Sequence, residues 1–209
     1  LYSVVIPALA LTITLQIIGS EINSSFYEAM SRGNDAARYI LSILFLQSTG
    51  SLSAAPPTNG PLWSLSYEFW YYSIFGAYVF SPGRISRIAL VAILSIIAGH
   101  KILLLFPCWL IGVALFVFKE KLRFLSSHPR AWLLASTFSL TAIIIFLPDF
   151  PFDVGRKGLF FSAAFISDWI LAFALAAFIA ACDAAGSDNF PQKLIAQLRT
   201  TGDYTFPLY

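Results

Sequence analysis

The stretch that decides the fold runs from residue 60 to residue 80 and reads GPLWSLSYEFWYYSIFGAYVF. Leu62–Phe80 is an apolar and aromatic run, close to the roughly 20 residues that an α-helix needs to cross a bilayer. Pro61 suits the first turn of such a helix, because its missing N–H costs nothing there. The run also contains a carboxylate, Glu68, and a charge inside a membrane span is expensive unless it is paired, hydrated or functional. The stretch therefore predicts a membrane helix with a functional group near its start.

The composition extends this interpretation to the whole chain. Of the 209 residues, 58% are hydrophobic and 11% are charged, and the mean hydropathy is +0.75. Soluble domains carry about 25% charged residues and have too little core to hide this much apolar surface. The net charge of +2 is too small to indicate a nucleic-acid partner. Cys108 and Cys182 lie in apolar runs and are expected to be free thiols, and no Cys/His spacing indicates a metal site.

The sequence predicts an all-α, polytopic transmembrane helix bundle with about six spans. The six runs are Leu1–Gly19, Leu62–Phe80, Ile85–Gly99, Ile102–Phe118, Ala131–Leu147 and Gly158–Cys182. Residues 85–118 are too long for one span, so we divide them at Gly99-His100-Lys101, their only polar break. Pro107 is expected to kink the second half. Ser81-Pro82-Gly83 is expected to end the span before it, and Thr205–Tyr209 to begin a further one.

Residues 20–61 are predicted to form a loop at the outer face, because they are richer in Ser, Asn, Gly, Pro and charge. Ala36–Gln47 within this loop favours a short helix, either at the membrane interface or packed on the bundle. Lys and Arg concentrate in cytoplasmic loops and so decide the orientation. The predicted cytoplasmic side carries Arg84, Arg87, Lys119, Lys121, Arg123, Arg130, Lys193 and Arg199, and the outer side carries Arg32, Arg38, Lys101, Arg156 and Lys157. Leu1 then starts at the cytoplasm, and the helix after Pro61 starts at the outer face.

The helix that begins near Trp63 is predicted to carry one polar stripe. At 100° per residue, the stripe comprises Ser64, Tyr67, Glu68, Tyr71 and Tyr78, and the opposite side comprises Leu65, Phe69 and Trp70. Such a stripe should face the bundle or a hydrated cavity. A simpler interpretation is an interfacial belt, since Trp and Tyr gather at headgroup depth and a Glu near a helix start is favoured by the macrodipole.

Four stretches resemble one known family. Trp63-Ser64-Leu65-Ser66-Tyr67-Glu68 resembles the Trp-Ser-Leu-Ser-x-Glu motif of the membrane acyltransferase-3 family, the O-acyltransferases that modify bacterial surface sugars. Leu1–Pro7 resembles the family's third helix, Pro107–Val113 its Trp-x-x-Gly element, and Gly202–Tyr209 its Gly-Asp-x-Ser-Tyr-Pro-Leu-Tyr stretch. The resemblance is collinear over the chain. It implies one integral-membrane acyltransferase-like domain, residues 1–209, holding helices three to eight of about ten.

The chain departs from the family in what it lacks. The family's arginine and histidine pair lies in the first two helices, and a further histidine follows the final Leu-Tyr pattern. Both fall outside this sequence, which begins at Leu1 without Met and is therefore interpreted as an internal piece of a longer protein, truncated at both ends. We expect the fragment alone to be inactive, and expect neither His100 nor His128 to be the catalytic base.

The resemblance implies an enzyme of the bacterial inner membrane, the plasma membrane. It would move an acyl group, foremost acetyl, from acyl-CoA as co-substrate to a hydroxyl of a carbohydrate or lipid-linked carbohydrate. Membrane lipid is a further expected partner, and no bound cofactor is expected. The expected catalytic residues, in supporting roles, are Glu68 and Ser64; the expected substrate-binding residues are Trp63, Tyr67, Trp70, Tyr71 and Asp168.

The chemistry of these groups leaves several alternatives open. Glu68 is suited to orienting a histidine of another helix or to holding a sugar hydroxyl, and Ser64 to donating a hydrogen bond. The aromatic rings are suited to stacking on a sugar or on a lipid-linked carrier. Asp168 is suited to pairing with an arginine or to forming part of a polar channel for the donor; the alternative is a structural ion pair or hydrogen bond with a neighbouring helix. The basic segment Lys119–Arg130 either meets coenzyme A phosphates or only fixes the topology.

Two other classes of protein fit the same composition. A multi-pass transporter or exporter of a polysaccharide or small solute would use Glu68 and Asp168 in a proton or substrate path, although no inverted repeat is evident. A non-catalytic membrane scaffold is the third alternative.

Overall fold

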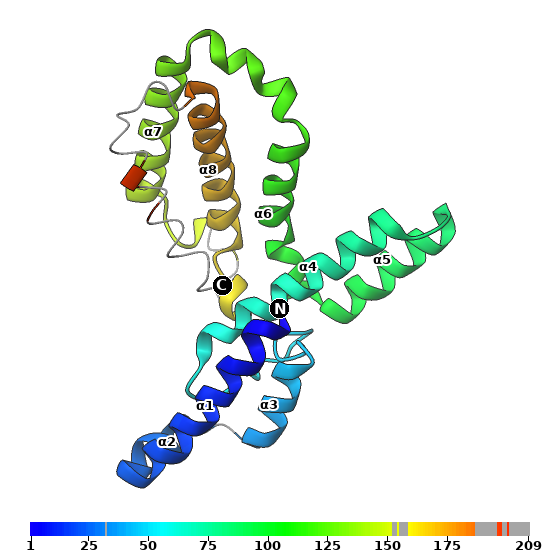
Figure 1. Cartoon of the computed structure of the whole chain (residues 1–209), viewed down its shortest axis with the longest axis vertical. Coiled ribbons are helices and arrows are strands. Elements are labelled where there is room, and N and C mark those ends of the chain that lie inside the picture. Colours follow the sequence, from blue (N-terminus) through cyan, green and yellow to red (C-terminus); the bar gives the residue numbers. More distant parts are fainter. Residues whose placement is uncertain (32, 152–153, 155–158, 187–195, 198–199, 201–209) are drawn as a thin grey trace. The chain divides into compact units, whose positions relative to one another are not determined.

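The computed structural model of the chain is helical, with no strand among the residues that it describes, which are 1–31, 33–151, 154, 159–186, 196–197 and 200 (Figure 1). The chain divides into two compact units. Unit 1 comprises Leu1–Phe106 with Lys157–Ser162, and unit 2 comprises Pro107–Arg156 with Ala163–Tyr209. Five predicted topogenic residues and the last family-like stretch lie outside the described residues: Arg32, Arg156, Lys157, Lys193, Arg199 and Gly202–Tyr209, which includes the expected further span.

The helices fall in the order that the sequence predicts. They are α1 (Tyr2–Ile22), α2 (Ser24–Met30), α3 (Asp35–Ile43), the 3-10 turn η1 (Gly60–Leu62), α4 (Trp63–Phe80), α5 (Arg84–Ala98), α6 (His100–Val117), the 3-10 segment η2 (Lys119–Ser127), α7 (Pro129–Phe146), the 3-10 turn η4 (Phe160–Ser162) and α8 (Phe165–Ala185). The last predicted span thus begins at Phe165 and not at Gly158, because Phe160–Ser162 form a separate turn before it.

Four of these helices, α1, α6, α7 and α8, are long and apolar enough to cross a membrane, which indicates a multi-pass membrane protein. The prediction of six spans is therefore confirmed only for these four helices, by their length and composition. Helix α5 has 15 residues, fewer than a comfortable span needs. Helix α4 has 18 residues, but Glu68 and its Ser and Tyr side chains lower its hydropathy. Pro107 lies inside α6, and the kink expected there stays a prediction.

The predicted division of residues 85–118 is confirmed, and two glycines explain its position. Helix α5 ends at Ala98 and α6 begins at His100, with Gly99 between them at a φ of 81°. The Gly50 N–H donates to the Ala98 carbonyl at 3.0 Å. A Cβ built on Gly99 would lie 2.6 Å from the Gly50 Cα, so a larger residue at Gly99 would displace backbone. The break is therefore set by a close approach of two backbones as well as by the left-handed conformation.

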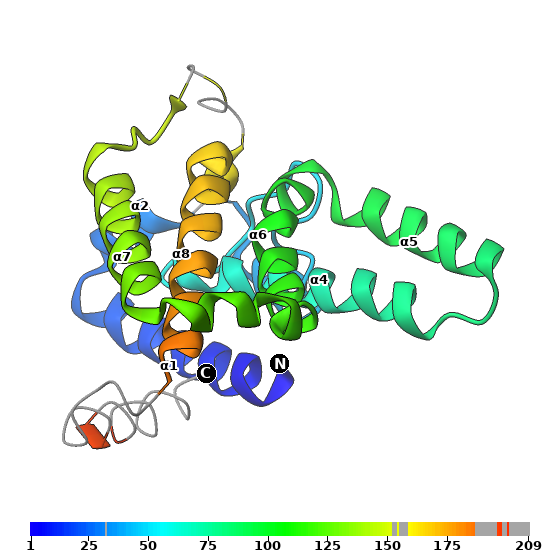
Figure 2. The same cartoon turned by 90° about the horizontal axis from the view of Figure 1, so that it is seen from above.

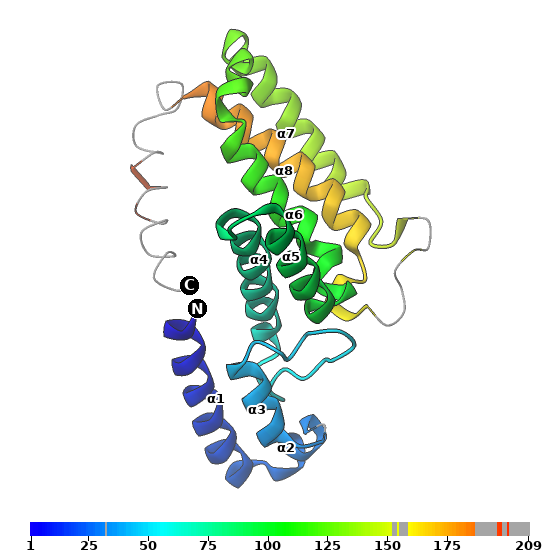
Figure 3. The ribbon, with the colours of Figure 1, turned by 90° about the vertical axis from the view of Figure 1, so that its right-hand side faces the viewer.

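Helix α3 folds back along α1 in unit 1 (Figure 3). Gln16 of α1 donates to the Asp35 carboxylate at 3.0 Å and accepts from the Tyr39 hydroxyl at 2.5 Å. Burial, together with the nearby Asp35 carboxylate, raises the pKa of Tyr39 above its ordinary value. The short helix predicted for Ala36–Gln47 therefore packs on another helix, and it ends earlier than predicted, at Ile43.

The start of α4 lies beside the middle of α1. Leu62 forms a buried cluster with Val5, Leu9 and Phe45, and the Asn59 amide donates to the Thr12 hydroxyl at 2.8 Å. The Lys and Arg pattern predicts Leu1 at the cytoplasmic face and the start of α4 at the outer face, whereas in the structure Leu62 and Phe45 contact the first half of α1, with the Phe45 and Tyr2 ring centres 5.2 Å apart. The second half of α1 extends past the start of α4, because α2 and α3 fold back on it and use its length as a packing surface.

Helices α4 and α5 form an antiparallel pair (Figure 2). The predicted break at Ser81-Pro82-Gly83 joins them, and Gly83 adopts a φ of 78° in this turn. The Arg87 guanidinium lies 5.6 Å from the centre of the Tyr78 ring, a cation–π contact between the two helices.

In unit 2, α7 and α8 pack side by side (Figure 2), and η2 packs on α8. Lys119 forms an exposed ion pair with Asp183 at 3.5 Å. Near the start of α8, the Ser167 hydroxyl donates to the Pro148 carbonyl at 2.6 Å. Cys108 and Cys182 are both free and half-buried, as predicted.

Candidate functional site

The candidate site is built around the start of α4. Pro61 occupies the first turn of η1, where no N–H is needed, and the chain continues directly into α4 at Trp63. The Ser64 hydroxyl donates to the Pro61 carbonyl at 3.1 Å, which closes this first turn. The residues that follow separate into a buried set and an accessible set.

Two residues of the buried set hold a strained turn. Phe45 lies just beyond α3 with a φ of 56°, a left-handed conformation that is uncommon for a bulky residue. Its carbonyl accepts the Ser66 hydroxyl at 2.7 Å and the Trp70 indole N–H at 3.1 Å. Ser66 is fully buried and Trp70 is 6% exposed. These two side chains therefore fix the turn after α3 to the wall of α4.

Tyr67, also buried, connects α4 to two distant segments. Its hydroxyl lies 2.9 Å from the Ser162 hydroxyl, and Ser162 donates to the Lys101 carbonyl at 2.7 Å. The Lys101 ammonium in turn donates to the Leu52 carbonyl. The segment between α3 and α4, the break before α6 and the turn η4 thus meet at one end of unit 1.

Lys101 is the feature of this end that the sequence interpretation missed. It was treated as a loop residue that helps to set orientation, but it is 1% exposed. Its ammonium lies 4.9 Å from the centre of the Phe160 ring, and no carboxylate lies within ion-pair distance among the described residues. No local signal in the sequence indicates this burial, since Lys101 is a lone lysine two residues after Gly99, near the start of a long apolar helix.

The accessible set lies on the other side of α4. Ser64 is exposed, Glu68 is half-buried, and Tyr72 is 50% exposed. The Tyr72 hydroxyl donates to a Glu68 carboxylate oxygen at 2.8 Å. Positions 64, 68 and 72 are one helical turn apart and form an open polar stripe. Tyr72 was not predicted, although its spacing of four residues from Glu68 is the signal that would have found it.

The polar stripe predicted from the helical period is therefore divided between the two sides. Tyr67 and Tyr71 turn into the unit, whereas Ser64, Glu68 and Tyr78 stay accessible. A helix face spans more than 100°, so residues that share a face by period can still fall on opposite sides of its packing boundary.

The predicted stacking residues have ring partners inside the unit. Trp63 stacks on Phe161 with ring centres 4.3 Å apart, and Tyr71 stacks on Phe106 at 5.1 Å. The first contact lies at the start of α4 and the second near its middle, and roles for these rings on a substrate stay predictions. Asp168 lies in the first turn of α8 in unit 2, half-buried, so the structure describes it apart from the α4 residues.

The two histidines are both exposed. His100 begins α6, and His128 precedes α7 with its Nδ1 3.1 Å from the Ser127 hydroxyl. Within the described residues, no hydrogen bond or ion pair joins either histidine to Glu68, and no group of three His, Cys, Asp or Glu side chains could hold a metal ion. What the site offers is therefore a carboxylate, a phenol and a serine hydroxyl on an open helix face.

These observations define an all-helical protein with the composition of a multi-pass membrane protein. No family model, curated protein or solved structure matches the chain.

Proposed function

We propose that the chain is part of a membrane-bound O-acyltransferase, which moves an acyl group, foremost acetyl, from acyl-CoA to a hydroxyl of a carbohydrate. The observation that carries this proposal is the division of the Trp63–Tyr72 segment. The Ser66 and Trp70 side chains are buried and donate to the Phe45 carbonyl. Glu68 stays accessible and accepts a hydrogen bond from the Tyr72 hydroxyl. The resemblance of this segment to the Trp-Ser-Leu-Ser-x-Glu motif supports the same assignment.

The reaction needs few groups, and the α4 stripe supplies some of them. The acceptor hydroxyl oxygen attacks the thioester carbonyl carbon, its proton passes to a base, the C–S bond breaks, and coenzyme A leaves as the thiol. Glu68 accepts a hydrogen bond from the acceptor hydroxyl or orients the base, and Ser64 donates one when its hydroxyl turns away from the Pro61 carbonyl. Tyr72 holds the Glu68 carboxylate in one orientation through the hydrogen bond of 2.8 Å. The base itself is not assigned to a residue of this chain.

The contacts at one end of unit 1 support a common face for three of the predicted loop segments. Segments around Leu52, Lys101 and Ser162, all assigned to the outer face, are tied to one another and to α4. In this proposal α4 and α5 cross the bacterial inner membrane together with the four more apolar helices, which gives six spans. The acceptor would meet Glu68 from the outer side, and acyl-CoA would approach from the cytoplasm.

The test is acetyl transfer by the full-length protein in membranes, with radiolabelled acetyl-CoA and the carbohydrate fraction counted. We expect Glu68→Gln to lower transfer by roughly 10²-fold, the scale of losing one positioned catalytic hydrogen bond, without changing the amount of inserted protein. Glu28→Gln is the matched control, because Glu28 is an exposed carboxylate of α2.

Normal transfer by a well-inserted Glu68→Gln variant would show that Glu68 has no role in the reaction. Solute flux without any consumption of acyl-CoA would favour the transporter in place of the enzyme.

A further inference from the structure

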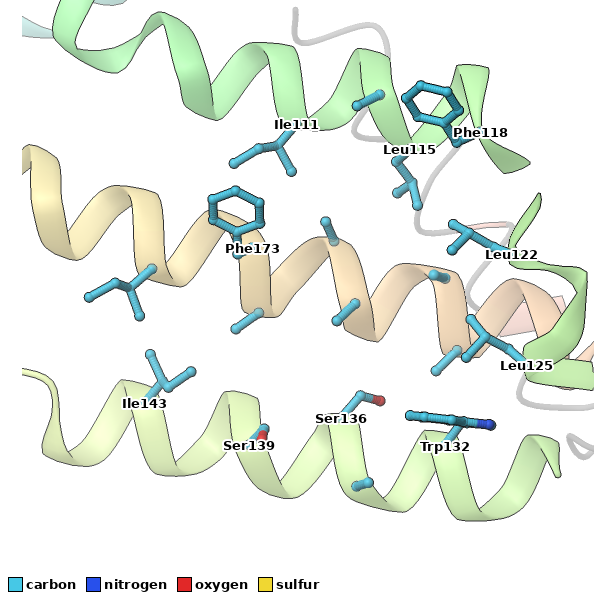
Figure 4. Close-up of a pocket in the computed structure, with 18 of the residues that line it drawn as sticks. Ile111, Leu115, Phe118, Leu122, Leu125, Trp132, Ser136, Ser139, Ile143 and Phe173 are labelled. Atoms are coloured by element: carbon cyan, nitrogen blue, oxygen red, sulfur yellow. The ribbon is translucent and has the colours of Figure 1, made fainter. Parts of the chain in front are cut away.

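Unit 2 contains a large apolar cavity that the proposed reaction does not use. Its volume is about 840 Å³, within the range of about 300–1,000 Å³ that ligand pockets occupy. Helix α8 forms its floor, α6 and α7 form its walls, and η2 closes one end with Leu122 and Leu125 (Figure 4). The space exists because α8 presents alanines to it, among them Ala174, Ala177 and Ala181.

The polar lining of this cavity is sparse. Ser136 and Ser139 of α7 point toward α8, and the Ser136 hydroxyl already donates to the Leu133 carbonyl of its own helix at 3.1 Å (Figure 4). Trp132 lies at the η2 end (Figure 4). A nucleotide or a sugar would leave most of its polar groups without partners here, whereas a hydrocarbon chain would not.

The end closed by η2 is charged. A second cavity of about 420 Å³ lies there, lined by Lys119, Glu120, Arg123 and Asp183, and it shares Leu115, Leu122 and Ala180 with the apolar one. Lys119 pairs with Asp183 at 3.5 Å, and Arg123 with Glu120 at 2.8 Å. The negative charges of Asp183 and Glu120 therefore balance the positive charges of Lys119 and Arg123.

Two further cations remain at this end. The Lys121 ammonium lies 5.0 Å from the centre of the ring of Phe118, a residue that lines the apolar cavity. Arg130 is exposed at the start of α7. A net positive charge therefore stands at one end of an apolar chamber, which is the complement of an amphiphile with an anionic head and a hydrocarbon tail.

We propose that this cavity binds an anionic phospholipid, with an acyl chain along α8 and the headgroup phosphate at Lys121 and Arg130. This inference rests on the multi-pass membrane assignment and not on the acyl-transfer proposal. A membrane phospholipid is favoured because the basic end belongs to the face that the Lys and Arg distribution assigns to the cytoplasm, where anionic lipids concentrate.

The test uses the full-length protein in phosphatidylcholine vesicles that contain a trace of phosphatidylglycerol with a photoactivatable diazirine in one acyl chain. We expect the label to map to peptides covering residues 111–118 and 173–181, which line the cavity. Unlabelled phosphatidylglycerol should compete roughly tenfold better than phosphatidylcholine, the effect of one to two cations at the surface.

Two exposed substitutions test the headgroup contact without risk to folding. Arg130→Gln should weaken labelling about fivefold, whereas Arg84→Gln, an exposed cation at the start of α5, should leave it within twofold. Ala177→Trp, which fills the chamber, should abolish labelling of residues 173–181.

Three outcomes would overturn the proposal. The first is equal competition by phosphatidylcholine, which would mean ordinary lipid contact. The second is equal competition by glycerophosphate without acyl chains, which would mean a free phosphate site. The third is label outside both peptides, which would mean that another protein segment covers the cavity.

Discussion

On one side of α4, Ser66 and Trp70 donate to a single buried carbonyl and Tyr67 contacts Ser162, so every one of these polar groups is bound within the unit. On the other side, the Tyr72 hydroxyl donates to the Glu68 carboxylate, and both side chains remain accessible. The two sides alternate along a segment of ten residues. One motif therefore combines an anchor, which should govern stability, with an open carboxylate, which should govern activity.

The largest expected effect is at the pair Gly50 and Gly99, where the segment after α3 meets the break between α5 and α6. Gly99→Val would place a Cβ 2.6 Å from the Gly50 Cα and require a left-handed φ of a branched residue. We expect a loss of about 3–5 kcal/mol in the free energy of unfolding, from overpacking together with backbone strain. Thermal unfolding of the purified protein in detergent measures it.

Gly112→Ala is the control for this prediction. A Cβ there meets nothing within 4 Å, and Gly112 lies inside α6, so alanine should stabilise the helix by up to about 1 kcal/mol. A Gly99→Val variant as stable as the wild type would show that the break between α5 and α6 does not depend on the close approach.

The second prediction tests whether Ser66 and Trp70 act as one anchor. Ser66→Ala and Trp70→Phe each remove one donor and leave the Phe45 carbonyl with the other, so each should lose about 1–2 kcal/mol. The double variant leaves the Phe45 carbonyl without either side-chain donor. Its free energy of unfolding should fall by at least about 0.5 kcal/mol more than the sum of the two single losses. Chemical unfolding of the wild type, the two single variants and the double variant completes this cycle. Strictly additive losses in the free energy of unfolding would show that the two donors act independently.

Much of the fold was predictable because apolar runs and their breaks are local signals. The run before Ser81-Pro82-Gly83 and the polar break at Gly99 each mark a helix end that the structure confirms. The free thiols were predictable for the same reason. The stagger of α4 against α1 was not, because it depends on the contacts of Leu62 with Val5 and Leu9, more than fifty residues away in sequence.

The candidate site was predictable only in part. The helical period found the polar residues of α4 but not the packing boundary that separates Tyr67 from Glu68. The burial of Lys101 had no local signal, since it depends on the Leu52 carbonyl and the Phe160 ring, which come from two distant segments. Contacts of this kind are made by tertiary packing and leave little trace in the periodicity of one helix.

The smallest expected effect on stability separates the open side of α4 from the anchor. Tyr72→Phe removes the hydroxyl that donates to Glu68 but keeps the ring, which is half-exposed, so unfolding should change by less than about 0.5 kcal/mol. Acyl transfer should nevertheless fall about fivefold, because the Glu68 carboxylate loses the donor that orients it, the energy of roughly one hydrogen bond. Ser66→Ala should give the opposite pattern, a loss of stability with transfer per folded molecule nearly unchanged. If both variants lost stability and transfer in proportion, the two sides of α4 would not be functionally distinct, and Glu68 would be part of the anchor.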